Sequence, residues 1–227
     1  NATGGSVFID ALGGGTMNIG GSAVAAADAF GGADTLNGIA GTAQGGDAQI
    51  RSAGGTLNIT GDATVSARGL GTSAFGIRTG ATASGGVAAL TAAGGQVTVG
   101  GNLFVTAEAI GAQGAQFTTS GASDAYGGNA VINIFNGGGT ITVGGDAYAA
   151  ASAVGGASNN AGAGSIGDAG QAIANIDGGG QITITGALLL EADGIGGDNA
   201  GGTGGVGLGA RASSAIFSGG TIDIGLN

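Results

Sequence analysis

The sequence predicts an all-β protein: a right-handed parallel β-helix (solenoid) with about 40 residues, three strands and one long glycine-rich loop per coil. Three observations predict this fold. A glycine pair followed by a short strand with alternating apolar residues, as in 54–59, recurs six times. The polar residue after each pair lies at 16, 56, 96, 140, 181 and 221, so the steps are 40, 40, 44, 41 and 40 residues. Glycine fills 58 of 227 positions, which disfavours helix because each glycine costs up to about 1 kcal/mol relative to alanine.

The repeat is expected to run through the whole chain, 1–227, as a single β-solenoid segment of about five and a half coils. The units lie near 6–46, 47–86, 87–128, 129–170, 171–210 and 211–227. The sequence opens and stops partway through a unit and has no initiator methionine, so we expect it to be part of a longer chain or filament.

Each unit is predicted to contain three strands, two tight glycine corners and a loop. In the first unit the strands cover 6–12, 16–19 and 22–30, and the loop covers 31–46. The later strands are expected near 47–53, 56–60, 62–70, 87–93, 96–99, 102–110, 129–135, 140–143, 146–154, 171–177, 181–185, 187–195, 211–217 and 221–224. The later loops are expected at 71–86, 111–128, 155–170 and 196–209.

The alternation within strands predicts which side chains line the interior. In the short strand these are Met17, Ile19, Leu57, Ile59, Val97, Val99, Ile141, Val143, Ile182, Ile184, Ile222 and Ile224. In the third strand they are smaller: Ala23, Ala25, Ala27, Ala63, Val65, Ala67, Leu103, Val105, Ala107, Ala147, Ala149, Ala151, Leu188, Leu190 and Ala192. Alanine facing isoleucine or valine indicates a narrow, flattened interior, in a rod of only about 26 Å. A propeller is the alternative for this period, but three strands per unit favour the solenoid.

Composition excludes several classes of protein. The net charge is −10, with no lysine and four arginines, which argues against nucleic acid or an anionic membrane as a partner. Cysteine is absent, so disulfides and thiolate metal sites are impossible. The chain has no apolar run long enough for a spanning helix and no signal-like segment, so membrane insertion is not expected.

The outward positions of the short strand form a row of small polar residues at rung spacing, the polar ladder. As candidate ligand-facing residues we single out Thr16, Asn18, Thr56, Asn58, Gln96, Thr98, Thr140, Thr142, Gln181, Thr183 and Thr221. Flat rows of threonine resemble ice-binding solenoids, and a glycan is the other candidate ligand. The same residues also suit any exposed stacked strand, through β-propensity and side-chain hydrogen bonds. The row is mixed, which favours this structural interpretation.

Two further outward rows are expected on the third strand. One, the charged row, contains Asp28, Arg68, Glu108, Ser152 and Asp193, and it places Arg68 between two acids as local charge balance. The other is largely apolar and contains Val24, Thr64, Phe104, Tyr148 and Leu189. The loops carry apolar residues of their own, namely Leu36, Ile39, Phe75, Ile77, Phe117, Ile166, Val206 and Leu208. We therefore expect the loops to cover the second row, although a lateral contact surface is the alternative.

Signals for metal binding and catalysis are weak. The segment 31–38 partly resembles a calcium-binding nonapeptide but lacks its glycine spacing and a tandem copy, so calcium in the loops is only a weak possibility and no cofactor is expected. Asp124, Asp168 and Asp198 are isolated in other loops. Without histidine, cysteine or paired carboxylates, catalysis has no residues to use, and the protein is predicted not to be an enzyme.

The recurring unit of two glycines, a four-residue strand and a glycine before Asp or Asn is seen in 54–62, 94–102 and 138–146. Along the whole chain it resembles the glycine-rich β-strand repeats of secreted bacterial surface proteins of the filamentous-haemagglutinin-like and autotransporter-passenger adhesin type. The resemblance implies an extracellular, cell-surface rod with a structural or adhesive role in a filament or biofilm matrix. Its expected partners are copies of itself stacked end to end, or further repeats of the same chain, and possible host or matrix surfaces.

Overall fold

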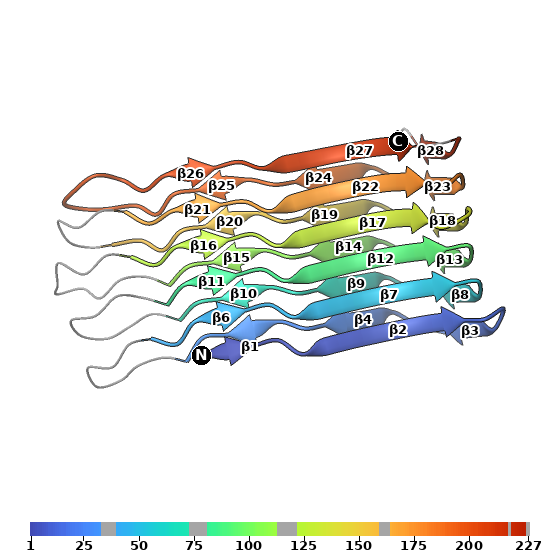
Figure 1. Cartoon of the computed structure of the whole chain (residues 1–227), viewed down its shortest axis with the longest axis horizontal. Helices are drawn as coiled ribbons and strands as arrows, with labels where there is room; N and C mark the ends of the chain where they lie inside the picture. The colour runs from blue at the N-terminus through green and yellow to red at the C-terminus, as the bar shows by residue number, and fades with distance from the viewer. Residues whose placement is uncertain (33–39, 73–80, 113–121, 159–163, 218, 226–227) are drawn as a thin grey trace.

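The computed structural model describes residues 1–32, 40–72, 81–112, 122–158, 164–217 and 219–225. Within these ranges all regular elements are strands, in five parallel sheets. Each strand pairs in parallel with its equivalent one repeat later, so that Thr56 lies between Thr16 and Gln96. The coils stack as flattened turns (Figure 1). The predicted all-β solenoid of parallel strands with one repeat per turn is therefore confirmed.

The first predicted strand of every unit forms the β2 sheet, the longest of the five, on one broad face of the molecule (Figure 1). Its strands are β2 (Ser6–Leu12), β7 (Asp47–Ala53), β12 (Val87–Ala93), β17 (Asn129–Phe135), β22 (Gln171–Asp177) and β27 (Arg211–Phe217). The second predicted strand forms the β3 sheet, which closes one narrow end of each coil. Its strands are β3 (Thr16–Ile19), β8 (Thr56–Ile59), β13 (Gln96–Val99), β18 (Thr140–Val143), β23 (Gln181–Ile184) and β28 (Thr221–Ile224).

The third predicted strand is present, but a two-residue break divides it into two ladders on the opposite broad face. The first ladder, the β4 sheet, contains β4 (Ala23–Ala26), β9 (Ala63–Ser66), β14 (Leu103–Thr106), β19 (Ala147–Ala150) and β24 (Leu188–Glu191). The second ladder, the β5 sheet, contains β5 (Ala29–Phe30), β10 (Gly69–Leu70), β15 (Ala109–Ile110), β20 (Ala153–Val154) and β25 (Gly194–Ile195).

The segments predicted as loops also contain a short strand each, which the sequence analysis missed. These strands form the β1 sheet: β1 (Ala2–Thr3), β6 (Ala43–Gln44), β11 (Ala83–Ser84), β16 (Ala125–Tyr126), β21 (Gly167–Asp168) and β26 (Gly207–Leu208). Two residues, in most units followed directly by glycine, give too short an alternation to predict a strand. What fixes them is pairing with the coils above and below, for example Ala83 with Ala43 and Ala125.

The two broad faces meet backbone to backbone along a line that we call the waist. The amide of Gly46 donates to the carbonyl of Ala27 at 2.8 Å, and that of Gly86 to the carbonyl of Ala67 at 2.7 Å. The same bond recurs at Gly128 and Gly170. A Cβ on the preceding residue, Gly45, would lie 2.1 Å from the Ala67 oxygen. Glycine is therefore required here because the opposite backbone leaves no room for a side chain.

The waist divides the interior into two lobes. In the wide lobe, between the β2, β3 and β4 sheets, Ile50, Leu90, Ile132 and Ile182 are fully buried. The narrow lobe lies between the β1 and β5 sheets, and its buried cluster consists of alanines only: Ala83, Ala109, Ala125 and Ala153. The predicted inward residues of the middle coils are buried, so the prediction of a thin apolar interior is confirmed there.

A ladder of side-chain hydrogen bonds fixes the corner between the β3 and β4 sheets. The Ser22 hydroxyl accepts from the amide of Asp62 at 3.1 Å, and the Asp62 carboxylate accepts from the amide of Asn102 at 2.7 Å. Asn102 and Asp146 continue the ladder to the amides of Asp146 and Ala187. The Asp or Asn after the glycine corner therefore satisfies a backbone donor of the next coil.

Candidate functional site

The structure brings the polar ladder together on the outer face of the β3 sheet. One column aligns Thr16, Thr56, Gln96, Thr140, Gln181 and Thr221, and the other aligns Asn18, Asn58, Thr98, Thr142, Thr183 and Asp223. The residues are exposed or half-buried. Because these strands are four residues long, the face is only two outward columns wide. All eleven candidate residues thus lie on one surface, a strip two outward residues wide.

Side chains within the ladder bond to one another between coils. The Asn58 amide donates to Asn18 Oδ1 at 2.8 Å, and the Gln181 amide donates to Asp223 Oδ2 at 2.8 Å. Such bonds hold neighbouring rungs in register, as cross-strand polar pairs do in other sheets. They also occupy donors and acceptors that a ligand would need. This geometry accounts for the ladder as a structural feature of an exposed sheet.

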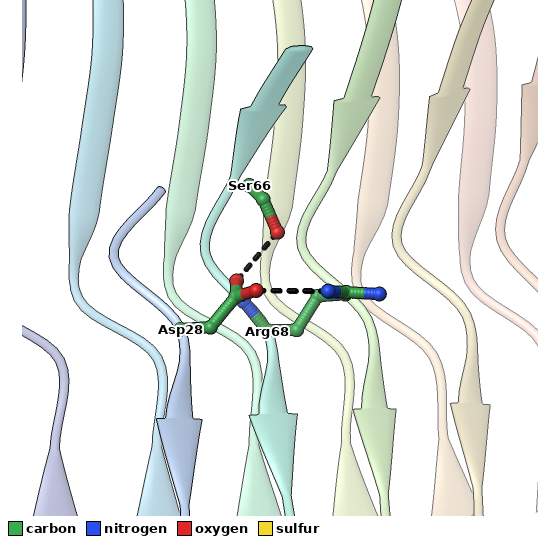
Figure 2. A network of polar contacts seen from close by, with 3 residues as sticks. All are labelled: Asp28, Ser66 and Arg68. Atoms are coloured by element: carbon green, nitrogen blue, oxygen red, sulfur yellow. Dashed lines mark hydrogen bonds and ion pairs between the residues drawn. The ribbon is translucent and has the colours of Figure 1, made fainter. Parts of the chain in front are cut away.

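The charged row lies outside the waist, in the break between the β4 and β5 sheets. Asp28 accepts from Arg68 Nη2 at 2.9 Å, from the Arg68 backbone amide at 2.8 Å and from the Ser66 hydroxyl at 2.5 Å (Figure 2). Partial burial by itself raises the pKa of Asp28, but these hydrogen bonds outweigh it and hold the pKa below its usual value. The predicted pairing of Arg68 with Asp28 is confirmed.

Glu108, the next residue in the charged row, is in a different electrostatic state. Burial raises the pKa of its carboxyl group; attraction to Arg68 acts against this, and repulsion from Glu191 and Asp28 adds to it. In the neighbouring coils the Tyr148 hydroxyl donates to Glu191 Oε2 at 2.8 Å. Burial and this bond raise the pKa of Tyr148. The negative charge of the row is therefore only partly compensated. Arg68 pairs directly with Asp28, and the ionised form of Glu108 is disfavoured.

A second ion pair, which the sequence analysis missed, lies on the β2 sheet. Arg51 donates from Nη2 to Asp10 Oδ2 at 2.6 Å and from Nε to Oδ1 at 3.2 Å, a two-bond geometry. The two residues are direct partners between β2 and β7. Their spacing of one repeat, 41 residues, was the available signal. Like Asp28 with Arg68, this pair joins adjacent coils.

The apolar row of Val24, Thr64, Phe104, Tyr148 and Leu189 is aligned as predicted. Its apolar members are not covered, since Val24 is 63%, Phe104 39% and Leu189 55% exposed, while Thr64 and Tyr148 are half-buried. The expectation that loops cover the whole row is therefore wrong. Of the loop residues expected to cover it, Leu36, Ile39, Phe75, Ile77 and Phe117 lie outside the described residues, Ile166 is half-buried, and Val206 and Leu208 are themselves exposed.

A more regular apolar row runs along the β5 sheet. It consists of Phe30, Leu70, Ile110, Val154 and Ile195, which pair in that order, and we call it the apolar ridge. Phe30 is 62% exposed, Ile110 47% and Ile195 53%. The sequence signal was available, since a bulky apolar residue immediately precedes glycine in all five repeats. It was overlooked because each of these residues lies at the last position of a predicted strand.

Two glycine-floored clefts flank the waist and the ridge. The larger, of about 550 Å³, runs along the waist over Gly45, Gly85 and Gly127, with Gln44 and Asn129 at its edges. The smaller, of about 270 Å³, lies beside the apolar ridge. Its walls include Ile110, Val154 and Ile195, and its floor includes Gly111, Gly155, Gly156, Gly196 and Gly197. Both clefts are shallow features that follow the stack of coils.

In the part of the chain that the structure describes, acidic side chains do not cluster into a metal-binding site. No group of three or more acidic side chains there is arranged to hold a metal ion. Most of the calcium-like segment, 33–39, lies outside the described residues. Asp124 has a structural role, since its carboxylate accepts from the amide of Ile166 at 2.8 Å. Over the same described ranges, no helix is long and apolar enough to cross a membrane.

No protein-family model matches the chain, and neither the curated proteins nor the solved structures contain a significant match.

Proposed function

We propose that this chain is a non-catalytic structural segment of an extended rod, whose end faces are covered by further coils of the same kind. The observation that carries the proposal is the exposure of core positions at the ends of the stack. Met17 is 37% exposed, whereas its equivalents Leu57 and Val97 are fully buried. Ile224 is 45% exposed, whereas its equivalent Ile184 is 1% exposed.

The backbone at the two ends supports the same proposal. Among the described residues, each inner strand has a parallel neighbour on both sides, whereas β2 pairs only with β7, and β27 only with β22. Such edges present unpaired donors and acceptors and readily accept another strand. A coil with the same strand lengths would satisfy these groups and bury the exposed apolar residues in one step. A second copy of the chain, or more repeats of the same chain, supplies such a coil.

The cellular role follows from the resemblance to bacterial adhesin repeats. We propose a secreted, cell-surface location, a structural or adhesive task in a filament or matrix, and right-handed winding, which parallel crossovers strongly favour. Host or matrix surfaces are the proposed external partners. Nucleic acid is disfavoured by the net charge of −10.

Electron microscopy and sedimentation of the 227-residue chain test the stacking proposal. The unmodified chain should form rods that lengthen with concentration. A Met17→Glu/Ile224→Glu variant should remain as single units, because it places charge on both end faces. Thr98→Glu, a change in the middle of the exposed ladder, is the matched control and should still form rods. A chain that stays monomeric, with β2 and β27 as protected from amide exchange as β12, would contradict the proposal.

A second candidate function is favoured by the alignment of the polar ladder, which could face ice or a glycan. Replacing Thr56, Thr140 and Thr142 together by tyrosine would abolish thermal hysteresis or glycan retention if the ladder binds such a ligand. The rod would persist, because these side chains point away from the core. If the unmodified chain shows neither activity, the ladder has no role in binding ice or the glycans tested.

A further inference from the structure

We propose that the apolar ridge is a side-by-side pairing surface between two copies of this chain, with the ridge of each copy lying in the smaller cleft of the other. This goes beyond stacking at the ends, because it uses a lateral face. It starts from five aligned apolar side chains, one per coil, of which Phe30, Ile110 and Ile195 are about half exposed or more. Monomeric proteins seldom leave such a continuous row uncovered.

The surface beside the ridge is complementary to it. The cleft begins at the glycines that follow three of the ridge residues, Gly111, Gly155 and Gly196, and it is floored by backbone. A Cβ at Gly111 would lie 2.3 Å from the Ser123 carbonyl oxygen, so the floor cannot be filled by a side chain of its own coil. Over the three coils of Ile110, Val154 and Ile195 the protruding row lies next to a hollow of the same length, and such a pair is self-complementary under a two-fold rotation.

The spacing of the ridge identifies a second solenoid as the partner. Ridge residues repeat once per rung, about every 4.8 Å. A helix presents successive turns every 5.4 Å, and a strand laid along the stack presents side chains on one face about every 6.6 Å. Over five rungs either would fall out of register. Another copy of this chain has the same period at every coil, so Ile110, Val154 and Ile195 can each find a hollow, while Phe30 and Leu70 continue the row at the same spacing.

The charged row determines how the two copies are oriented. It runs parallel to the ridge, two residues earlier in the chain, or roughly 6.6 Å away. With antiparallel solenoid axes and ridge against ridge, the two charged rows would face each other, and Glu108 would oppose its own copy. If the two-fold axis instead runs parallel to the stack and passes between ridge and cleft, the two charged rows lie roughly 20 Å apart. That separation is greater than the Debye length of about 8 Å, so salt screens the repulsion between the rows. The parallel arrangement is therefore favoured.

The area involved is that of a weak dimer. Burying the exposed parts of the five ridge side chains, of which Leu70 and Val154 are already half-buried, removes at most roughly 1,000 Å² in total, the lower bound for a specific interface. We test it by sedimentation equilibrium from about 5 to 500 µM in the Met17→Glu/Ile224→Glu background, which removes end stacking. Adding Ile110→Thr and Ile195→Thr should weaken dimerisation at least tenfold. Adding Leu189→Thr instead, an equally exposed residue outside the ridge, should leave it unchanged.

Cross-linking distinguishes this contact from every other association. The chain has no native cysteine, so Ile110→Cys introduces a single thiol. The proposed pairing places the introduced thiols of the two copies within reach of a short bismaleimide, whereas end stacking separates them by roughly 29 Å. Ile110→Cys should give a dimer band and Leu189→Cys should not. A monomer at all concentrations, equal effects of ridge and Leu189 changes, or no selective cross-link from the Ile110→Cys variant would each overturn the pairing, whether or not rods form.

Discussion

In both lobes of each coil the strands pair in parallel with the coils above and below, but different side chains fill the two lobes. In the wide lobe, fully buried residues such as Ile132 and Leu90 separate two sheets with large side chains. In the narrow lobe the space between the sheets contains only small side chains, and a Cβ at Gly69 would lie 2.1 Å from the Ser84 carbonyl oxygen. The lobes therefore differ in thickness because of the residues between them, not because of their hydrogen bonding.

This difference divides the energetics of the fold. A buried isoleucine contributes about 2–3 kcal/mol of hydrophobic free energy, and a buried alanine much less. The wide lobe must supply most of the apolar stabilisation, while the narrow lobe depends on pairing between coils. The narrow lobe also carries the apolar ridge on its outer face. A thin extension of this kind adds exposed surface at little cost in core residues, which suits a contact surface.

The largest expected effect is at the waist, where the two lobes meet. Gly46→Ala would place a Cβ 2.0 Å from the Gly5 carbonyl oxygen, and no backbone shift relieves this without breaking the bond from Gly46 to Ala27. We expect a loss of more than about 4 kcal/mol, seen as failure to fold or a large fall in the urea midpoint.

Gly5→Ala is the matched control for this change, because Gly5 has the same place in the first coil. In the Met17→Glu/Ile224→Glu background, which stays as single units, a Cβ there meets nothing within 4 Å, so stability should change by less than about 0.5 kcal/mol. Equal effects at the two positions would mean that contacts between coils do not set the glycine requirement.

The next-largest expected effect is the loss of stability when a buried side chain is truncated, compared between the two lobes. Ile132→Ala removes a fully buried side chain from the wide lobe and should cost about 2–5 kcal/mol. Ala125→Gly, at a fully buried narrow-lobe position, should cost only about 1 kcal/mol. Urea denaturation followed by circular dichroism measures both. A narrow-lobe loss as large as the wide-lobe loss would show that the division of stabilisation proposed above is wrong.

The sequence predicts the wide lobe well and the narrow lobe poorly, for one physical reason. Alternation of polar residues with isoleucine or valine marks the inward face of a strand, so Leu57 and Ile59 were placed correctly. Alanine and glycine carry no such contrast. The sequence therefore predicts a loop over 71–86, where the structure has a strand at Ala83 and the waist bond at Gly86.

For the candidate surfaces, the sequence predicts which residues are aligned between coils but not which of them are exposed. Aligning repeats predicts which residues share a column, so Arg68 with Asp28 and the whole polar ladder could be placed. Whether a column is covered depends on the course of the chain around it, which alignment does not contain. The exposure of Leu189 and the cleft beside Ile110 therefore required the structure.

A smaller, pH-dependent effect is expected on the outside of the waist. The pKa of Asp28 is lower in the folded protein than in the unfolded chain, so its contribution to stability is present above the unfolded value near 3.8 and is lost as the pH falls through the folded value. Asp28→Asn should cost about 1 kcal/mol at pH 7, reduced by solvent around the 40% exposed Arg68 side chain, and clearly less at about pH 2. Urea denaturation at the two pH values checks this, with exposed Asp193→Asn as the control. A cost that persists at low pH would indicate a packing effect.

The smallest expected effect has the opposite sign and comes from Glu108, one coil beyond Arg68. Because its pKa is raised on folding, the folded state loses stability as the pH rises from the unfolded value, near 4.5, through the folded value. Glu108→Gln should therefore stabilise the protein by a few tenths to about 1 kcal/mol at pH 7 and leave it unchanged near pH 3. Glu191→Gln is the matched control, and it should not stabilise, since the Glu191 carboxylate accepts the Tyr148 hydroxyl at 2.8 Å. Destabilisation by Glu108→Gln at pH 7 would mean that attraction to Arg68 outweighs burial, and that the charged row is fully compensated where the two lobes meet.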